Sequence, residues 1–462
     1  MEGYHVENFG CRASRADGDA LAAELERRVG GAVPAAEAGV VVLNTCAVTA
    51  DAERTARAYL RRVKRENPLA RVVVTGCYAQ RAPQEVAGLA GVDAVVGNSH
   101  KALAAGIAAD PDAMDEALRS AGFVPLAGMA PVLADDRFAH ANLAAEDLSA
   151  TAGTRPNLKV QDGCGNRCSF CIIPTTRGAS RSMPLADALA RVEGFVEAGG
   201  QELVLSGINL GRWGRDLNNG ARLEDLVAAI LERTGLPRLR ISSVEPMDWS
   251  AELLGLFREY GREEAAATGP RLARHAHLPL QSGADATLRA MHRRYRPWHY
   301  AEKLAAIREA LPEAGVGADV MVGFPGETEA LFEESYRFIE AQPFTYLHLF
   351  PFSARPGTAA WALTQEKAVP GPAVRERMER LRALAAAKQA GFRAGLAGRA
   401  LAAVTLRRTE DERQRGVTPA LTDNFLRVAV AGAVAPNRMV RCLATEDTIL
   451  KEGSIAGRDS VI

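Results

Sequence analysis

The sequence predicts an α/β protein with three parts: an N-terminal doubly wound parallel-sheet domain, a central partial barrel of parallel strands, and a small C-terminal all-β module. Apolar strand-like runs alternate with helix-like segments in the first two parts, and short β-branched runs replace them after Gly398. The 462 residues are 47% hydrophobic and 24% charged, which is ordinary globular usage and allows several buried cores. We place the parts at 1–110, 151–382 and 383–462, with a connector at 111–150.

Short apolar runs in the first hundred residues have the character of buried parallel strands. Val40–Leu43, Arg71–Thr75 and Asp93–Val96 are such runs, and Asp51–Glu66 contains helix formers without Gly or Pro. This order of strand, helix and strand predicts a parallel sheet covered by helices. The segment after it is rich in Ala, Asp and Pro, and predicts a connector with some helix.

The central region repeats the alternation with six candidate strands. Helical stretches such as Leu185–Ala198 and Leu223–Arg233 lie between them. Six strands with helical crossovers predict a parallel barrel or partial barrel, in which the active site gathers at the carboxyl ends of the strands. The candidate strands are Leu158–Gln161, Glu202–Leu205, Leu239–Ser243, Ala273–Pro279, Gly317–Val322 and Thr345–Phe350.

The last part begins with an Arg-rich linker helix, Pro370–Gln389. Leu401–Leu406 and Phe425–Val430 are short β-branched runs separated by turn residues. These runs predict a small all-β module of about 60 residues.

Charge and hydropathy narrow the classes of function. Lys plus Arg and Asp plus Glu both number 56, so the net charge does not support nucleic-acid binding and any basic surface must be local. The N-terminus lacks the segments of a signal peptide, and no run of about 18 apolar residues predicts a membrane span. We therefore expect a cytoplasmic protein without a membrane partner. In that compartment the seven cysteines favour metal or redox chemistry over disulfides.

Three cysteines lie within eight residues, in the spacing CxxxCxxC at Cys164, Cys168 and Cys171. Thiolates are soft ligands that suit zinc or an iron–sulfur cluster. No His or further Cys lies close by as the fourth ligand of a zinc site, so a cluster with one open iron is favoured over a zinc knuckle.

Three more cysteines end predicted strands of the N-terminal sheet. Cys46 and Cys77 follow apolar runs directly, and Cys11 follows an expected first strand around Tyr4–Asn8. Because the carboxyl ends of parallel strands meet at one edge of a sheet, these thiols could converge into a second three-cysteine cluster site. Three buried structural cysteines are the alternative that the pattern leaves open. Cys442 fits no motif and is interpreted as a small buried hydrophobe.

The cysteine motifs together resemble the methylthiotransferases of the radical S-adenosylmethionine superfamily, over nearly the whole chain. The motifs are Gly10-Cys11, Asn44-Thr45-Cys46, Thr75-Gly76-Cys77-Tyr78-Ala79-Gln80, Asp162-Gly163-Cys164 through Cys171-Ile172-Ile173-Pro174, and Arg177-Gly178. The resemblance implies a radical S-adenosylmethionine barrel, an N-terminal domain with an auxiliary cluster and a TRAM-like RNA-binding module. It also implies two [4Fe-4S] clusters and S-adenosylmethionine as cofactors, with Cys164, Cys168 and Cys171 at the catalytic cluster and Cys11, Cys46 and Cys77 at the auxiliary one.

The resemblance assigns further residues at predicted strand ends to S-adenosylmethionine. They are Gly207, Asn209, Ser243, Glu245 and Gln281. The alternative for each is an ordinary turn after a strand, but barrel active sites gather at these ends.

Basic residues cluster locally, as the neutral total requires. Arg54–Arg71 and Arg375–Arg399 are two such clusters, and a third contains Arg293, Arg294 and Arg296. Charge runs are usually solvated faces, but three of them beside a radical site favour contacts with RNA phosphates. We interpret Arg293, Arg294 and Arg296 as RNA-binding or as ligands of a substrate carboxylate.

The reaction that the resemblance implies is methylthiolation of carbon 2 of a modified adenosine in tRNA. Adenine at that carbon is neither acidic nor nucleophilic, so a radical route is required. The motifs around Cys46 and Cys77 look closest to the subfamily that acts on threonylcarbamoyladenosine beside the anticodon. Isopentenyladenosine, a ribosomal protein aspartate and a nonenzymatic iron–sulfur RNA-binding regulator are the alternatives, in that order.

The same resemblance gives the expected partners. They are a tRNA anticodon stem–loop and a reductase, flavodoxin or ferredoxin as electron donor, and we expect a monomer. The chain departs from the family after Cys11, where Arg12-Ala13-Ser14-Arg15-Ala16-Asp17 stands in place of the usual Asn and Glu.

Overall fold

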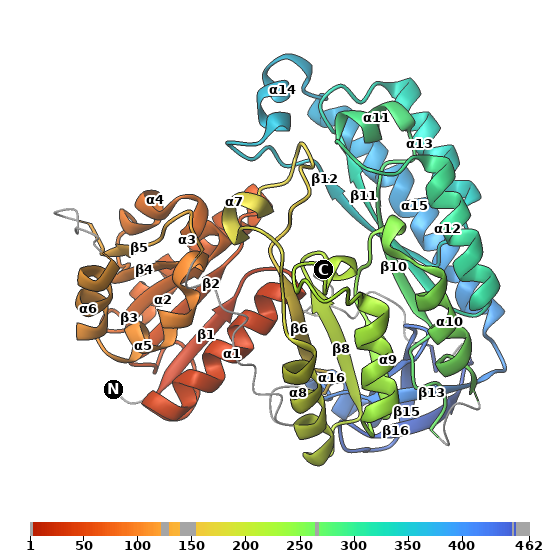
Figure 1. The fold of residues 1–462 in the computed structure, drawn as a ribbon, viewed down its shortest axis with the longest axis horizontal. Coiled ribbons are helices and arrows are strands. Elements are labelled where there is room, and N and C mark those ends of the chain that lie inside the picture. The colour runs from red at the N-terminus through yellow and green to blue at the C-terminus, as the bar shows by residue number, and fades with distance from the viewer. Residues whose placement is uncertain (1–2, 122–128, 139–153, 264–267, 446–447, 450–462) are drawn as a thin grey trace.

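The computed structural model describes residues 3–121, 129–138, 154–263, 268–445 and 448–449. Figure 1 shows the three expected parts, with the N-terminal domain beside an open crescent of parallel strands and a small sheet at one end of the crescent. The fold class predicted from the sequence is confirmed. None of the described helices is both long and apolar enough to cross a membrane.

The N-terminal domain contains a five-stranded sheet in the order β1-β2-β3-β4-β5, in which every pairing is parallel. Successive side chains of each strand point to opposite faces of the sheet. Val41 and Val72 pack on one face, whereas Val42 and Val73 pack on the other. The strands are β1 (Tyr4–Asn8), β2 (Val40–Thr45), β3 (Arg71–Gly76), β4 (Ala94–Gly97) and β5 (Val132–Leu133).

Helices cover both faces of this sheet, as expected for a doubly wound domain. One face carries α2 (Ala50–Glu66), α3 (Cys77–Arg81) and α4 (Pro83–Ala87). The other carries α1 (Arg12–Val29), α5 (Ala104–Ala109) and α6 (Asp112–Ala121), and the 3-10 helix η1 (Asn98–Leu103) precedes α5. Because α6 and β5 complete this domain, these two elements of the expected connector belong to it, and residues 122–128 and 139–150 lie outside the described residues.

Six parallel strands form the central crescent, at the positions predicted. Backbone pairing joins the strands within two sheets, and single bridges such as Ser243 to His277 join the sheets. The strands are β6 (Asn157–Asp162), β8 (Glu202–Gly207), β9 (Arg238–Ile241), β10 (His275–Gln281), β11 (Gly315–Val322) and β12 (Tyr346–Pro351), with the two-residue β7 (Arg181–Ser182) antiparallel to β6.

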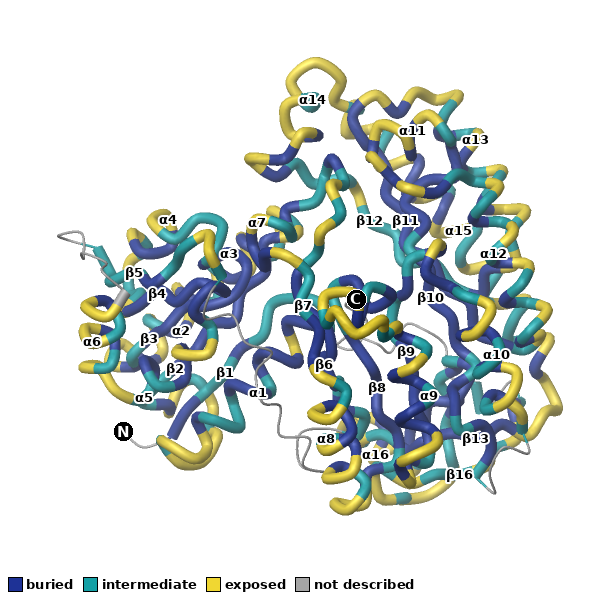
Figure 2. The backbone as a smooth tube through the Cα atoms, viewed as in Figure 1, coloured by how far each residue is buried: buried dark blue, intermediate teal, exposed yellow. Residues whose placement is uncertain are grey.

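Helices cover the outer face of the crescent and shield a continuous apolar core, which appears as dark blue strands in Figure 2. These helices are α8 (Leu185–Glu197), α9 (Leu223–Arg233), α10 (Ala251–Tyr260), α11 (Asp285–Ala290), α12 (Pro297–Ala310), α13 (Glu329–Ala341) and α15 (Gly371–Gly395). The central region also contains α7 (Ile173–Arg177), α14 (Ala359–Lys367) and the 3-10 helices η2 (Leu210–Arg212) and η3 (Pro246–Asp248). Since α15 runs unbroken, the expected domain boundary at residue 382 falls inside a helix.

The C-terminal module is an antiparallel sheet docked against the amino ends of the barrel strands. Arg240 of β9 donates to the carbonyls of Thr422 (2.9 Å) and Asp423 (3.0 Å), and the rings of His275 and Phe425 stack at 4.4 Å. The module therefore closes the end of the barrel opposite to the predicted active site. Its elements are β13 (Ala400–Thr405), α16 (Glu410–Gln414), β14 (Val417–Thr422), β15 (Arg427–Ala431) and β16 (Met439–Leu443), in the sheet order β15-β14-β13-β16.

Candidate active site

The loop with Cys164, Cys168 and Cys171 connects β6 to α7 at the carboxyl end of the first barrel strand. Gly163, just before it, has a φ of +72°, and a Cβ there would lie 2.0 Å from the carbonyl oxygen of Ala179. Only glycine fits this close approach of the two strands. The Cys171 amide donates to the Cys168 carbonyl at 3.1 Å, so the chain turns tightly between the last two thiols.

Hydrogen-bond donors surround the sulfur atoms of this loop. The Asn166 amide and the Asn209 side chain lie 3.4 and 3.5 Å from the Cys164 sulfur, and Arg293 Nη1 lies 3.4 Å from the Cys168 sulfur. Burial, followed by the neighbouring thiols, raises the pKa of Cys171 to about 12. Without added positive charge, Cys171 in this site therefore stays a neutral thiol. The irons of a cluster supply the positive charge that would stabilise three thiolates.

The other three cysteines meet at the carboxyl edge of the N-terminal sheet. Cys46 follows β2, Cys77 follows β3 and Cys11 precedes α1. Gly76 has a φ of +96°, and a Cβ there would lie 2.3 Å from the Thr45 carbonyl oxygen, so glycine lets the chain turn Cys77 in beside β2. A Cβ at Gly10, next to Cys11, would lie 3.2 Å from the Cys46 Cβ, and burial followed by the Cys77 and Cys11 thiols raises the pKa of Cys46 to about 12.

The spacing of the sulfurs argues against a single metal ion in either trio. Around tetrahedral zinc, thiolate sulfurs are about 3.8 Å apart. Among the described residues, one group of three potential metal ligands has all its ligand atoms within 4.8 Å of one another, and that group contains no cysteine. In each cysteine trio, at least two sulfurs are therefore farther apart than 4.8 Å. Each trio is therefore more open than a zinc site and fits a larger group such as an iron–sulfur cluster, with three protein ligands and one position left free.

The short helix α7 brings the two trios to the same interface. Ile172, next to Cys171, packs in the apolar core of the N-terminal domain together with Cys77. Asn98 completes the link, because its side-chain amide donates both to the Cys77 sulfur (3.3 Å) and to the Thr176 carbonyl (2.8 Å). The N-terminal domain thus places its cysteines beside the mouth of the barrel.

A buried charge network fixes this interface. Asp17 of α1 forms ion pairs with Lys101, Lys159 and Arg177, and Asp162 of β6 pairs with Lys159 and Arg177. Burial alone would raise the pKa of Asp17, but the three cations hold it well below its usual value. Three cations face two carboxylates, so one positive charge is in excess beside the thiols of the N-terminal trio.

Arg177 carries that excess charge toward the sulfurs. Burial alone would lower its pKa, but Asp162, Cys77, Asp17 and Cys11 raise it well above the ordinary value. The cation therefore favours thiolate forms of the N-terminal cysteines. Asp17 belongs to the segment after Cys11 that departs from the family pattern, and the structure shows it to be the carboxylate at the centre of the network.

The residues assigned to S-adenosylmethionine lie at the carboxyl ends of β8, β9 and β10. Gly207 ends β8, and the backbone N–H of Asn209 donates to the side-chain oxygen of Gln161 at 2.7 Å. Gln281 ends β10 with a φ of +66° and a buried side-chain oxygen that has no hydrogen-bond partner among the described residues. An unsatisfied buried oxygen at this rim fits a polar ligand such as an amino or hydroxyl group.

Ser243 and Glu245 already have partners in the protein. The Ser243 hydroxyl lies 2.7 Å from His277 Nδ1, and the Glu245 carboxylate accepts from Arg293. Ser243 therefore faces the barrel interior beside His277, whereas Glu245 faces the cysteine loop.

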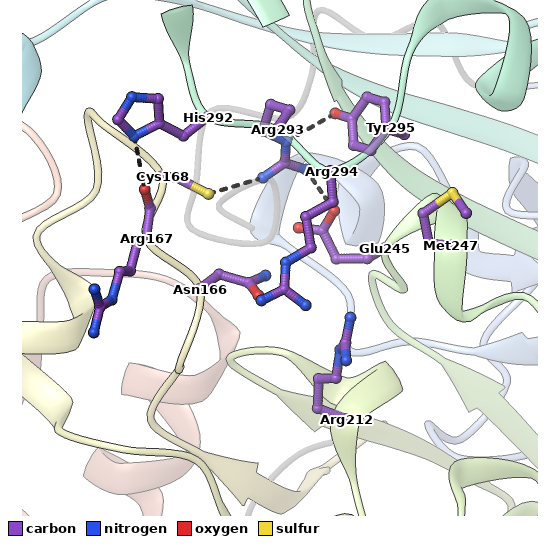
Figure 3. A pocket seen from close by; sticks show the side chains of 10 residues that line it. All are labelled: Asn166, Arg167, Cys168, Arg212, Glu245, Met247, His292, Arg293, Arg294 and Tyr295. Carbon is purple, nitrogen blue, oxygen red and sulfur yellow. Dashed lines mark hydrogen bonds and ion pairs between the residues drawn. The ribbon is translucent and has the colours of Figure 1, made fainter. Parts of the chain in front are cut away.

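The three arginines of the third basic cluster have different surroundings, as Figure 3 shows for two of them. Arg293 is buried and contacts Glu245, Tyr295 and the Cys168 sulfur, which places it at the cysteine loop rather than on a free RNA-facing surface. Arg296 pairs with Asp285 and caps the carbonyls of Arg293 and Tyr295. Arg294 is exposed at a pocket that Arg167 and Arg212 also line.

Sequence reasoning missed several residues of this region. Gln161 orients Asn209, and His348 lies beside Asp319 on the neighbouring strand, whereas Arg293 was singled out for RNA but contacts the Cys168 sulfur. His348 could have been found from its position, because it lies in the predicted strand Thr345–Phe350 and Asp319 lies in the preceding predicted strand. Paired strands bring such residues together. Arg293 gave no such signal, because a loop arginine is exposed more often than not.

Comparison with known proteins agrees with this geometry. Residues 3–97 match a model described as uncharacterized protein family UPF0004, and residues 158–339 match the radical SAM superfamily. A threonylcarbamoyladenosine tRNA methylthiotransferase MtaB of Aquifex aeolicus is 34% identical over 440 residues, covering 95% of this chain and 98% of the relative. The Bacillus subtilis MtaB is 34% identical over 397 residues, covering 86% and 82%.

This chain belongs to the radical S-adenosylmethionine methylthiotransferase family. A tRNA-2-methylthio-N(6)-dimethylallyladenosine synthase of Cereibacter sphaeroides is also 34% identical, over 85% of both chains. The predicted cofactors of the methylthiotransferases, [4Fe-4S] clusters and S-adenosylmethionine, are confirmed by this membership. The ligand roles of individual residues stay predictions that the geometry supports.

The fold also matches a solved structure of another radical enzyme. The radical S-adenosylmethionine methyltransferase TsrM of Kitasatospora setae superimposes with a TM-score of 0.56, at 15% identity and 80% coverage of both chains. At this identity the likeness concerns the fold alone, and it supports the joint arrangement of N-terminal domain and barrel in this methylthiotransferase.

Proposed function

We propose that this methylthiotransferase adds a methylthio group to carbon 2 of threonylcarbamoyladenosine next to the anticodon of tRNA. The observation that carries the substrate is the relationship to the two MtaB proteins, one of which is similar over 95% of this chain. The Cereibacter sphaeroides relative named for dimethylallyladenosine reaches the same identity over 85% of the chain, so both groups of relatives share the methylthiolation and differ in the modified base.

The charges around the cysteine loop favour the same substrate. Arg167 and Arg294 are exposed beside the pocket of Figure 3, and no ion-pair partner is found for either among the described side chains. Threonylcarbamoyladenosine carries a carboxylate, which the planar fork of an arginine binds through both oxygens. A dimethylallyl group is uncharged and would instead favour an apolar lining.

The six cysteines divide the chemistry between two sites. When bound, a cluster at Cys164, Cys168 and Cys171 supplies the electron that cleaves S-adenosylmethionine to the 5′-deoxyadenosyl radical. In this proposal Asn209 and Gln281 bind polar groups of S-adenosylmethionine at the strand ends. Cys11, Cys46 and Cys77 hold the auxiliary cluster at the interface, where Arg177 stabilises their thiolates.

The partners follow from this assignment. The substrate is the anticodon stem–loop of tRNA, the electron donor is a reductase, flavodoxin or ferredoxin, and the active protein is a monomer in the cytoplasm. The C-terminal sheet adds RNA affinity as a TRAM-like module. Since that sheet closes the opposite end of the barrel, its RNA contacts lie away from the reacting base.

The test offers the reconstituted enzyme anticodon stem–loops that carry either threonylcarbamoyladenosine or dimethylallyladenosine. We expect methylthiolation of the first. Arg294→Gln should raise its KM by about tenfold, the value of one charge-assisted hydrogen bond, whereas Arg337→Gln, an exposed arginine on α13, should not change it. Methylthiolation of the dimethylallyl substrate alone would reject the substrate and leave the family assignment standing.

A further inference from the structure

Three polar side chains meet inside the barrel, below the cysteine loop. They are His277 of β10, Asp319 of β11 and His348 of β12, and their ligand atoms all lie within 4.8 Å of one another. The strand register produces this meeting, because Asp319 is paired directly with His348 while His277 lies beside Gly317, two residues earlier on β11. Gly317 has no side chain, and the Tyr346 ring fills the space that a Cβ would need.

The facing atoms of this trio are not joined by well-aligned hydrogen bonds. His277 Nε2 and His348 Nδ1 each lie 3.4 Å from the same Asp319 oxygen, Oδ1. All three atoms are buried and have no hydrogen-bond partner among the described residues. The contacts that these atoms make with one another are long for hydrogen bonds, and a group placed between them would satisfy all three, since buried polar atoms are nearly always hydrogen-bonded.

The two histidine–aspartate distances fit a tetrahedral metal ion, and the ligand atoms of the two histidines lie within 4.8 Å of each other. With zinc–nitrogen and zinc–oxygen bonds of about 2.0–2.2 Å, two tetrahedral ligands lie about 3.4 Å apart, whereas octahedral ligands at about 2.1 Å lie about 3.0 Å apart. The observed separations are 3.4 Å for both histidine–aspartate pairs. Imidazole nitrogen and carboxylate oxygen are ordinary zinc ligands, and two His with one acidic residue leave a fourth position for water.

A supporting contact fixes one of the ligands. The Ser243 hydroxyl lies 2.7 Å from His277 Nδ1 and thus orients the ring so that Nε2 faces Asp319. Metal-bound histidines commonly have such a partner on their other nitrogen. His277 and Asp319 are buried, but the His348 side chain is 29% exposed, which gives an ion a route of entry.

We propose that His277, Asp319 and His348 bind a zinc-type divalent cation inside the barrel, separate from both cysteine trios. The cation would join β10, β11 and β12 and neutralise the buried carboxylate between two imidazoles. Its fourth position would hold a water.

The test uses the full-length enzyme with its clusters reconstituted anaerobically, freed of loosely bound metal and titrated with zinc chloride. We expect about one zinc per chain for the wild type and for His299→Gln, a matched change on α12. His348→Gln should bind zinc at least tenfold more weakly with unchanged iron content, which shows that the variant is folded. Equal zinc binding by wild type and His348→Gln would overturn the proposal.

Zinc X-ray absorption of the wild type supplies a second readout that does not depend on any variant. The proposal predicts nitrogen and oxygen neighbours at about 2.0–2.1 Å and no sulfur. Sulfur neighbours at about 2.3 Å would place the zinc at vacated cysteine sites and overturn the assignment, as would a wild type that binds no zinc.

Discussion

The two cysteine trios are built differently. Cys164, Cys168 and Cys171 lie on one loop of eight residues, held by Gly163 and the turn before α7. Cys11, Cys46 and Cys77 are 35 and 31 residues apart and meet because three parallel strands end at the same edge. The first trio is thus defined by local sequence, whereas the second exists only when the N-terminal sheet has formed.

The difference also concerns charge. The loop trio is approached by neutral donors and by Arg293, which is paired with Glu245. The N-terminal trio faces Arg177, which belongs to a buried network with an excess cation. Removing a residue from the loop should therefore affect its own site, whereas removing one from the network should affect both the N-terminal trio and the domain interface.

The largest expected effect comes from the loop trio. Replacing Cys164, Cys168 and Cys171 together by Ala should abolish cleavage of S-adenosylmethionine, because a three-ligand site has no spare thiolate. Iron in the reconstituted protein should fall from about eight to about four per chain. Cys442→Ala is the matched control and should change neither value, since Cys442 lies in β16 of the distant C-terminal sheet. Residual cleavage by the triple variant would show that the loop is not the radical site.

Arg177→Met tests the charge network between the trios. The change removes the buried hydrogen bonds from Arg177 to Asp17 and Asp162, which should cost about 3–5 kcal/mol of unfolding free energy although Lys101 and Lys159 still balance the two carboxylates. Anaerobic urea unfolding measures this loss, with the exposed Arg337→Met as control. A loss below about 1 kcal/mol would mean that the network does not hold the two domains together.

A third prediction concerns acid stability at the barrel end far from both trios. Burial alone would raise the pKa of Glu202, but Arg240, Arg155 and Arg238 lower it to about 2 from an ordinary 4.5. The folded pKa lies below the unfolded one, so this stabilisation is complete above about pH 4.5 and is lost as the pH falls toward 2. It amounts to about 3 kcal/mol.

Unfolding free energies of wild type and Glu202→Gln, measured from pH 6 to pH 3, isolate this contribution. The gap between the two proteins should narrow as the pH falls. A constant gap would contradict the assigned pKa direction, and a change in iron content at neutral pH would contradict the separation of this region from the trios.

The smallest effect is expected for Arg293, which supports the loop trio without being a metal ligand. Arg293→Met should slow S-adenosylmethionine cleavage by about 10–100-fold, the usual effect of losing a contact to a ligand, and should shift the reduction potential of the loop cluster. Arg294→Met should leave both unchanged, because Arg294 is exposed and makes no contact with a cysteine sulfur in the described structure. If the two variants behave alike, Arg293 does not support the loop cluster, and the RNA-binding role predicted from the sequence is favoured instead.

The sequence was sufficient for the architecture, because strand-like runs and short motifs encode local structure, and the cluster roles of the six cysteines stay predictions. The six predicted barrel strands agree with β6, β8, β9, β10, β11 and β12, although Leu239–Ser243 ends two residues beyond β9. The convergence of Cys11, Cys46 and Cys77 followed from one rule about parallel sheets.

Interactions between distant segments were beyond the sequence. The basic run Arg375–Arg399 predicted phosphate contacts, but Arg377 and Arg380 pair with glutamates at Glu327, Glu329 and Glu333 and hold α15 against α13. The docking of the C-terminal sheet on Arg240 was equally hidden, because no local pattern states which end of a barrel a later module covers. Which acidic residue an arginine pairs with depends on which residues lie close in the folded protein, and the number of charges in a sequence segment does not show this.

The central claim is that the two trios have separate chemical roles, and the variant with Cys11, Cys46 and Cys77 replaced by Ala tests it most directly. The measurement is mass spectrometry of one anaerobic reaction with S-adenosylmethionine, a reductant and the threonylcarbamoyladenosine stem–loop, in which 5′-deoxyadenosine and methylthiolated base are quantified together. We predict that the variant still forms 5′-deoxyadenosine and forms no methylthiolated base. Methylthiolated base at the wild-type level would contradict the account and make these three cysteines structural.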